Sequence, residues 1–265
     1  MNATINNIIY DRFYELHRQG FEVLNNQEGQ AVYHRGVPVW IKLREVSHAR
    51  SFFCSFLHNC ADIPFTEIVI AKEVAHLCLQ ALMEATAKQY QSREMLSLYL
   101  PSDIVLPDVS GILELPHSID DLMFVMQGIN EFREEAFSHV AHTPLNNATA
   151  TQEAWEEDDD DEKEAKREVI PPLYIWRAGS GKPALAMGLL STGEANRRLN
   201  LIYTPTNERR KGYAYHLTNA LCHMARDEGK VPVLYVYEDN VGAVKLYQSL
   251  GFTLAGRLTE LSEVN

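Results

Sequence analysis

The sequence has few cysteines and no long apolar run. Its 265 residues include four cysteines, which lie in apolar or helix-like contexts without the dense spacing of a disulfide framework. No segment approaches the ~20 apolar residues that a membrane-spanning helix needs. The first seven residues have neither the basic start nor the apolar core of a signal peptide. These absences predict a soluble, cytoplasmic protein without disulfides and without a membrane partner.

Positive charge is also scarce, since 24 Lys and Arg face 36 Asp and Glu and give a net charge of −12. The imbalance is uneven, because residues 153–168 hold ten acids and three bases and so contribute −7 of it. The remainder of the chain is only mildly acidic, at −5. We expect no nucleic-acid partner.

The acidic stretch lies in a polar segment, residues 138–170, that carries little to bury in a core. Its composition and self-repulsion favour a disordered insertion at about residues 146–168. The other interpretation is an acidic docking arm for a basic partner.

The N-terminal part begins with three strand-like runs at residues 20–24, 30–34 and 37–43, separated by turn residues. Apolar residues then recur at helical spacing over residues 67–89, which predicts one long amphipathic helix. Two prolines break residues 100–107 and indicate a connection between domains. We therefore expect an N-terminal α/β accessory domain over residues 1–110 and a second domain over residues 111–265.

The second domain opens with a predicted short strand, residues 111–115, and a helix to about Phe137 with Ser118 as its N-cap. Beyond the acidic segment, residues 173–177 and 183–190 predict a hairpin. Strands beginning at Arg198 and Val231 then flank a helix from Gly212 to Glu228. This order predicts an α/β (α+β) fold with a mixed sheet covered by helices.

The stretch Arg209-Arg210-Lys211-Gly212-Tyr213-Ala214 stands between an apolar strand and this helix. A basic turn that opens a helix gathers free backbone N–H groups and the positive end of the helix dipole around one point. Such a turn is suited to a phosphate or pyrophosphate.

The turn resembles the Arg/Gln-x-x-Gly-x-Gly/Ala signature of the GNAT superfamily of N-acetyltransferases, with Arg209, Gly212 and Ala214 at the specified positions. The strand of residues 231–237 and the run from Asn240 to Phe252 resemble the second signature of that family. The resemblance covers residues 199–254. It implies a mostly antiparallel GNAT-like sheet flanked by helices, with acetyl-CoA as co-substrate.

The resemblance also implies roles for particular residues. Tyr247 would protonate the departing thiolate as the catalytic acid, and Asn240 would either bond the pantetheine arm or cap the following helix. The backbone near Tyr203 and Thr204 would stabilise the oxyanion. The residues expected to bind the cofactor are Ile202, Tyr203, Thr204, Arg209, Arg210, Lys211, Gly212, Tyr213, Ala214, Asn240 and Ala243.

Three other sites do not fit the sequence. Gly179-Ser-Gly-Lys182 fails as a P-loop because Trp176 and Pro183 stand where glycine and Ser/Thr are required, and the Gly212 turn lacks the glycines of a dinucleotide fingerprint. Cys54, His58, Cys60, His76 and Cys78 lack the paired spacing of a structural zinc site, so we expect no metal.

The sequence therefore predicts an acyl-CoA-dependent N-acyltransferase in which an amine attacks the thioester directly. The acceptor stays open between a small-molecule amine and a protein amine. No general base is assigned, because strand alternation would point Glu238 and Asp239 to opposite faces. The alternative function is a catalytically silent acyl-CoA-binding sensor or scaffold.

Overall fold

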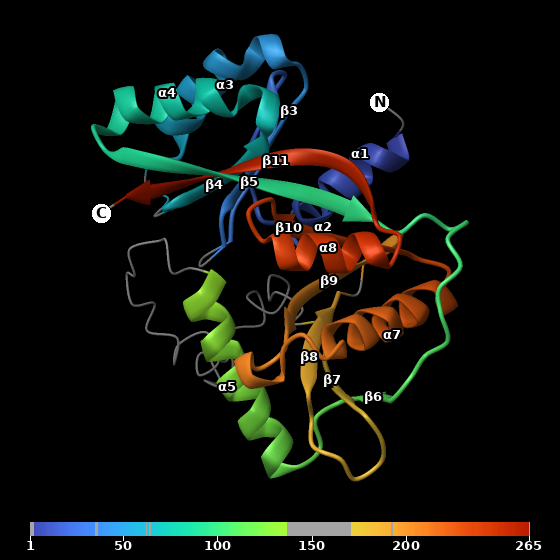
Figure 1. Cartoon of the computed structure of the whole chain (residues 1–265). Helices are drawn as coiled ribbons and strands as arrows, with labels where there is room; N and C mark the ends of the chain where they lie inside the picture. The colour runs from blue at the N-terminus through green and yellow to red at the C-terminus, as the bar shows by residue number, and fades with distance from the viewer. Residues whose placement is uncertain are drawn as a thin grey trace, which may run out of the picture. The chain divides into compact units, whose positions relative to one another are not determined.

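The computed structural model describes residues 3–34, 37–61, 63, 65–136, 171–191 and 193–264. It contains two compact units (Figure 1). The first unit comprises Met1–Asp11, Glu94–Ala136 and Ile170–Arg257, and the second is built mainly from Arg12–Arg93 and the chain end from Leu258. The predicted acidic insertion lies outside the described residues. None of the described helices combines the length and the apolarity that crossing a membrane requires.

The second unit is a sheet with two helices in its core. Strands β1 (Glu22–Asn25), β2 (Gly29–Val32) and β3 (Val39–Leu43) are antiparallel, β4 (Glu67–Ala71) runs parallel to β3, and the end of β11 (Thr253–Val264) pairs antiparallel with β4. Helices α3 (Ala49–Asn59) and α4 (Ala75–Thr86) pack into one apolar cluster with these strands. Short 3-10 turns, η1 (Val46–His48) and η2 (Lys72–Val74), precede the two helices.

The long helix predicted over residues 67–89 is wrong. Residues 67–71 form β4, a 3-10 turn follows, α4 occupies Ala75–Thr86, and β5 (Gln89–Tyr99) begins directly afterwards. Ile68, Val69 and Ile70 are fully buried between neighbouring strands. Consecutive β-branched residues that are buried on both faces favour a strand, and their spacing alone cannot distinguish it from a helix.

The first unit is a mixed, mostly antiparallel sheet, as predicted. The strands β6 (Ile112–Glu114), β7 (Leu173–Arg177), β8 (Ala186–Leu190) and β9 (Asn196–Tyr203) are antiparallel neighbours. Strand β10 (Val231–Tyr237) pairs parallel with β9 and antiparallel with β5 on its other side. The predicted hairpin at residues 173–190 is thus the β7–β8 pair.

Helices cover both faces of this sheet. Figure 1 shows α5 (Ile119–Ala136) on one side of β7–β9 and α7 (Tyr213–Asp227) on the other. Phe124 and Ile129 of α5 pack on Met187 and Tyr203, while Leu217 and Leu221 of α7 belong to the larger core with α8 (Val241–Ser249). Helix α1 (Ala3–Ile9) also belongs to this unit, and α2 (Asp11–Arg18) begins at its border with the second.

The N-terminus of α5 is held by the capping arrangement that the sequence indicates. The Ser118 hydroxyl accepts from the Asp121 N–H at 3.1 Å, and the Asp121 carboxylate accepts from the Ser118 N–H at 3.2 Å. Asp121 also pairs with Arg177 of β7, and both side chains are buried. The cap therefore fixes α5 to the sheet as well as starting the helix.

The two units share one order of elements: three antiparallel strands, a helix, a strand parallel to the third, a second helix and a last strand. In the first unit this series is β7, β8, β9, α7, β10, α8 and β11; in the second it is β1, β2, β3, α3, β4, α4 and β5. The last strand of each series pairs with a strand of the other series: β5 pairs with β10, and β11 pairs with β4. The domain boundary near residues 101–110 stays a prediction. The compact units themselves divide within β5, between Arg93 and Glu94, and within β11, between Arg257 and Leu258.

Candidate functional site

The parallel strands β9 and β10 separate at their carboxyl ends. Their pairing runs from Asn196 with Val231 to Leu199 with Leu234, yet β9 continues to Tyr203 and β10 to Tyr237. Beyond Leu199 and Leu234 the two strands no longer pair with each other. Ligands of α/β sheets bind at such an opening, outside the carboxyl ends of parallel strands.

A bulge in β9 contributes to this separation. Its register with β8 changes so that two residues of β9, Leu201 and Ile202, oppose one of β8, Gly188, between the Leu189–Asn200 and Met187–Tyr203 pairs. Leu201 adopts a positive φ of 53°, and its N–H donates to the Asn200 side chain at 2.8 Å. A bulge bends its strand and increases the twist, which directs the end of β9 away from β10.

The turn at residues 209–214 follows β9 after a short 3-10 turn, η4 (Thr206–Glu208). Arg210 and Gly212 both have positive φ, 66° and 89°, and Gly212 is the N-cap of α7. The His216 N–H donates to the Gly212 carbonyl at 3.1 Å, which begins the hydrogen bonds of the helix. The N–H groups of Tyr213, Ala214 and Tyr215 precede it and belong to the unpaired first turn. This arrangement can bind an anion through backbone N–H groups.

Two of the three basic side chains of the turn are paired with acids. The Arg209 guanidinium donates to Glu135 of α5 at 2.6 and 2.9 Å and to the Thr204 carbonyl at 3.0 Å. Lys211 donates to Glu208 at 2.9 Å. Arg210 has no such partner in the described part of the chain. The structure thus places Arg209 in the wall of the turn and leaves Arg210 as the cation available to a ligand.

The end of β9 places Ile202, Tyr203 and Thr204 at the opening. Tyr203 is buried, and its hydroxyl donates to Glu131 of α5. Burial, and then this hydrogen bond, raise the pKa of Tyr203 above its usual value. Thr204 is 8% exposed, and its buried hydroxyl oxygen has no partner among the described residues. An unpaired buried hydroxyl at a strand end is available to a bound group.

Strand β10 leads into α8, which carries the other predicted residues. The Asn240 side chain accepts from the Ala243 N–H at 3.2 Å and so caps α8. Tyr247 follows one turn after Ala243 and is 7% exposed within the core of the first unit. Burial raises the pKa of Tyr247 above its usual value, so the phenol stays protonated across the neutral range. A protonated phenol can act as a general acid.

Sequence reasoning missed a cluster of side chains beside the turn. His216 stacks on Trp176 with ring centroids 5.4 Å apart and an angle of 13° between planes, and Tyr213 stacks on the same indole at 5.5 Å. The His216 Nδ1 atom lies 2.7 Å from the Ser110 hydroxyl. The signal was present, because His216 stands four residues after Gly212 and so lies on the same helix face.

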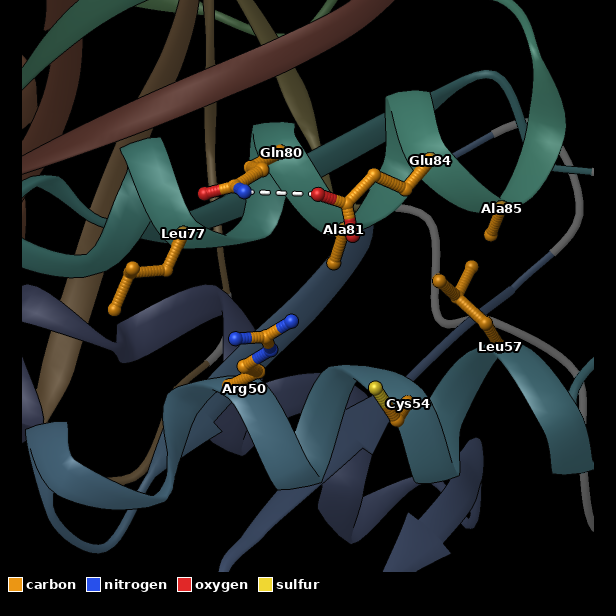
Figure 2. A pocket seen from close by; sticks show the side chains of 8 residues that line it. All are labelled: Arg50, Cys54, Leu57, Leu77, Gln80, Ala81, Glu84 and Ala85. Atoms are coloured by element: carbon orange, nitrogen blue, oxygen red, sulfur yellow. Dashed lines mark hydrogen bonds between the residues drawn. The ribbon is translucent and has the colours of Figure 1, made fainter.

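The second unit has a groove of its own, of about 370 Å³, between α3 and α4. Figure 2 shows Cys54 and Leu57 of α3 facing Ala81 and Ala85 of α4, with Arg50 and Leu77 toward the other end. The preceding turn, η1, contains no glycine and no positive φ, and His48 at the N-cap of α3 makes no side-chain cap. This groove therefore lacks a turn like that of residues 209–214 in the first unit.

The cysteines and histidines considered as metal ligands do not gather. Cys60 and Cys78 are buried, Cys54 is exposed, and all are free thiols. Within the described ranges, no group of three or more His, Cys, Asp or Glu side chains could hold a metal ion.

Known structures share this fold across nearly the whole chain. A GCN5-related N-acetyltransferase from Kribbella flavida is 11% identical, with a TM-score of 0.60 and coverage of 100% of this chain and 97% of that one. An acetyltransferase of the GNAT family from Colwellia psychrerythraea is also 11% identical (TM-score 0.53; 97% and 96% covered). A GCN5-related N-acetyltransferase from Sphaerobacter thermophilus is 16% identical (TM-score 0.53; 89% and 76% covered).

At these identities the solved structures establish the fold alone, and no curated protein matches the chain. A family match comes from the sequence itself. Residues 133–252 match the model of the acetyltransferase (GNAT) family, and that range contains β9, the 209–214 turn, α7, β10 and α8. Residues 133–252, slightly under half of the chain, therefore match a GNAT acetyltransferase domain in sequence, and the whole chain has the fold of solved GNAT structures.

Proposed function

We propose that the chain is an N-acyltransferase that transfers an acetyl group from acetyl-CoA to an amine. The observation that carries this proposal is the opening between β9 and β10, because the 209–214 turn follows one of these strands and Tyr247 follows the other. An elongated thioester can then place its phosphates at the turn and its pantetheine between the strands.

The residues of the turn fit a pyrophosphate. A Cβ atom added to Gly212 would have only the His216 ring near it, at 3.8 Å, so the backbone faces open space. A ligand can therefore approach the free N–H groups of α7 directly. Arg210 would add a charge-assisted contact.

The chemistry needs two groups from the protein. As the amine nitrogen bonds to the thioester carbonyl carbon, negative charge develops on the carbonyl oxygen, and backbone N–H groups near Tyr203 and Thr204 would stabilise it. When the carbon–sulfur bond breaks, Tyr247 would donate its proton to the leaving thiolate, and the proton that the nitrogen loses as the amide forms would restore the phenol through water. Burial that raises the pKa of the phenol would also disfavour the thiolate, so both partners prefer their neutral forms in this core.

The direct test measures thiol release from acetyl-CoA with a panel of small amines and peptides, with mass spectrometry of the products. The matched variants are Gly212→Ala and Gly229→Ala, which place the same methyl group at positive φ at the two ends of α7. Each should cost about 1 kcal/mol of stability, but only Gly212→Ala should lose acetyl-CoA affinity. Binding of acetyl-CoA without turnover on any amine would favour the silent sensor, and equal affinity of both variants would place the cofactor elsewhere.

A further inference from the structure

A stripe of polar side chains along α7 holds the segment at residues 101–110. Arg226 donates to the carbonyls of Pro101 and Ile104, both at 2.6 Å. Asn219 and His223 both reach the Pro107 carbonyl, at 3.0 and 2.9 Å. The segment thus runs along the helix toward its N-terminus. The spacing of the stripe continues to His216, which contacts Ser110.

His216 differs from the other members of this stripe. The side chains of Asn219, His223 and Arg226 form hydrogen bonds with backbone carbonyls. The Nδ1 atom of His216 instead lies 2.7 Å from the Ser110 hydroxyl. Trp176 stacks on the imidazole and donates from Nε1 to the Ser110 carbonyl at 2.8 Å. Ser110 and Trp176 therefore fix both the plane and the rotation of the ring.

The remaining ring nitrogen of His216 lies at the phosphate turn. The Nε2 atom is 3.8 Å from the position that a Cβ on Gly212 would take. Side chains of a helix tilt toward its N-terminus, so a residue four positions into α7 covers the first turn. The N–H groups of Tyr213, Ala214 and Tyr215 are unpaired in that same turn.

The contact with Ser110 allows the tautomer that carries its proton on Nε2. A serine hydroxyl can donate to Nδ1, and a neutral imidazole that accepts at Nδ1 carries its proton on Nε2. That proton is a donor beside the backbone N–H groups of the turn. A donor held by stacking and by a second hydrogen bond loses little entropy when it binds an anion.

We propose that His216 is a cofactor-binding residue whose Nε2–H donates to the pyrophosphate of acetyl-CoA at the 209–214 turn. Ser110 and Trp176 are positioning residues that set the tautomer and the orientation of the ring. This proposal rests on the proposed function, because it takes acetyl-CoA as the ligand of the turn. It adds a side-chain contact from within the helix to the backbone cradle.

The test compares His216→Phe with the wild type against three ligands: coenzyme A, 3′-dephospho-coenzyme A and pantetheine. Phenylalanine keeps an aromatic ring against Trp176 and removes both nitrogens. Hydrogen bonds to charged groups contribute enough that affinity for the two pyrophosphate-containing ligands should fall roughly 10-fold. Pantetheine affinity should not change. Calorimetry measures all three, and the thermal midpoint without ligand checks folding.

His223→Phe is the matched control, because it makes the same substitution on the same helix face at a ring that bonds Pro107 instead. It should leave all three affinities unchanged. Nitrogen-15 NMR of the wild type gives an independent readout that needs no variant: the Nε2–H signal of His216 should shift with 3′-dephospho-coenzyme A and stay in place with pantetheine.

Each other outcome has a distinct meaning. Wild-type protein that binds none of the phosphate ligands would defeat the proposed function itself. Wild-type binding together with unchanged His216→Phe affinities would overturn only the inference on His216. An equal loss for pantetheine would make His216 a packing residue, and a loss confined to coenzyme A would assign it to the 3′-phosphate, so both would also overturn the proposal.

Discussion

Arg209 and Glu135 join the 209–214 turn to helix α5, with the guanidinium donating to both carboxylate oxygens at 2.6 and 2.9 Å. The same guanidinium lies over the Tyr203 ring, 5.8 Å from its centroid, and Tyr203 in turn donates to Glu131 of α5. Residues that are more than 70 positions apart in sequence therefore support the end of β9. The pair also places a carboxylate close to a proposed anion site.

Glu135→Gln should strengthen the binding of acetyl-CoA. Removing a negative charge near the phosphates and releasing Arg209 from its acid should raise affinity about 2- to 5-fold, since exposed charge pairs are worth up to ~1 kcal/mol. Calorimetry at low salt measures this, and 0.5 M salt should reduce the gain. Glu134→Gln makes the same charge change one residue away and should have a smaller effect. A weaker complex in Glu135→Gln would mean that the pair aims Arg209 at the ligand.

Tyr247→Phe tests the proton donor. The ring is buried and packs edge-on against Phe252, so removing one hydroxyl should leave packing and acetyl-CoA affinity nearly unchanged. Turnover should fall roughly 10- to 1000-fold, a range set around the usual contribution of a general acid and extended downward because water can replace it. Tyr174→Phe, a tyrosine that packs on the same core, is the control.

The pH dependence of turnover sharpens this test. Because burial raises the pKa of the Tyr247 phenol above its ordinary value near 10, its ionisation cannot shape the rate below about pH 10. Wild type and Tyr247→Phe should therefore have profiles of the same form up to that pH, differing only in height. Wild-type turnover in the variant would show that Tyr247 only packs.

The chain should bind one molecule of acetyl-CoA despite its repeated order of elements. Both units place a helix after the third strand of the series, but only the turn before α7 has a glycine at positive φ. Calorimetry should give a stoichiometry of one, and Gly212→Ala should remove all of the measured heat. A second equivalent that survives this variant would assign binding to the groove between α3 and α4 in Figure 2.

The sequence predicted the features that depend on local order. The strands near residues 22–43, the Ser118 cap, the Gly212 turn and, as one of two roles left open for Asn240, the cap of α8 all follow from neighbouring residues. The sequence did not predict which distant segments pair with each other. Strand β5 follows α4 in the chain but pairs with β10, and nothing in its composition specifies a partner more than 130 residues away. Strand β4 is buried on both faces, as strands in parallel pairing usually are, so its continuous apolar run was predicted as part of a helix.

The residues of the candidate site likewise fall into those that the sequence predicted and those that it did not. The backbone cradle and Tyr247 were predicted from two motifs, because motifs record spacing along one strand, turn and helix. Glu131 and Glu135 could not be found, since they reach Tyr203 and Arg209 only after α5 packs on the sheet. Gly128 permits that approach, because a Cβ there would lie 3.0 Å from the Tyr203 ring. Tertiary packing therefore decides which cations of the turn remain available.

Asp121→Asn should destabilise the first unit. Burial opposes ionisation of Asp121, but hydrogen bonds from Arg177 and from the His117 and Ser118 region outweigh it and lower its pKa to about 2. The stabilisation is present above the unfolded pKa near 4 and is lost as the pH falls toward 2. Removing the charge leaves Glu114 as the remaining ion-pair partner of the buried Arg177, at a cost of about 2 kcal/mol near pH 7.

Urea unfolding at pH 7 and pH 3 checks this expectation, with the exposed neighbour Asp120→Asn as control. The difference between Asp121→Asn and the wild type should shrink at the lower pH. A difference that does not depend on pH would show that shape, not charge, holds α5 at this point.

Glu67→Gln should change the free energy of unfolding in the opposite direction and should stabilise the second unit. Burial, and then repulsion from Glu260, raise the pKa of Glu67 to about 7. An acid whose pKa is higher in the folded state binds a proton more readily there, so stability falls as the pH rises from about 4 to 7. Glutamine mimics the protonated form and should add on the order of 1–2 kcal/mol at pH 8, discounted for partial exposure. Near pH 4 the gain should vanish. Thermal unfolding across this range measures it, with the exposed Glu73→Gln as control, and destabilisation at pH 8 would mean that the Glu67 carboxylate is needed in its charged form.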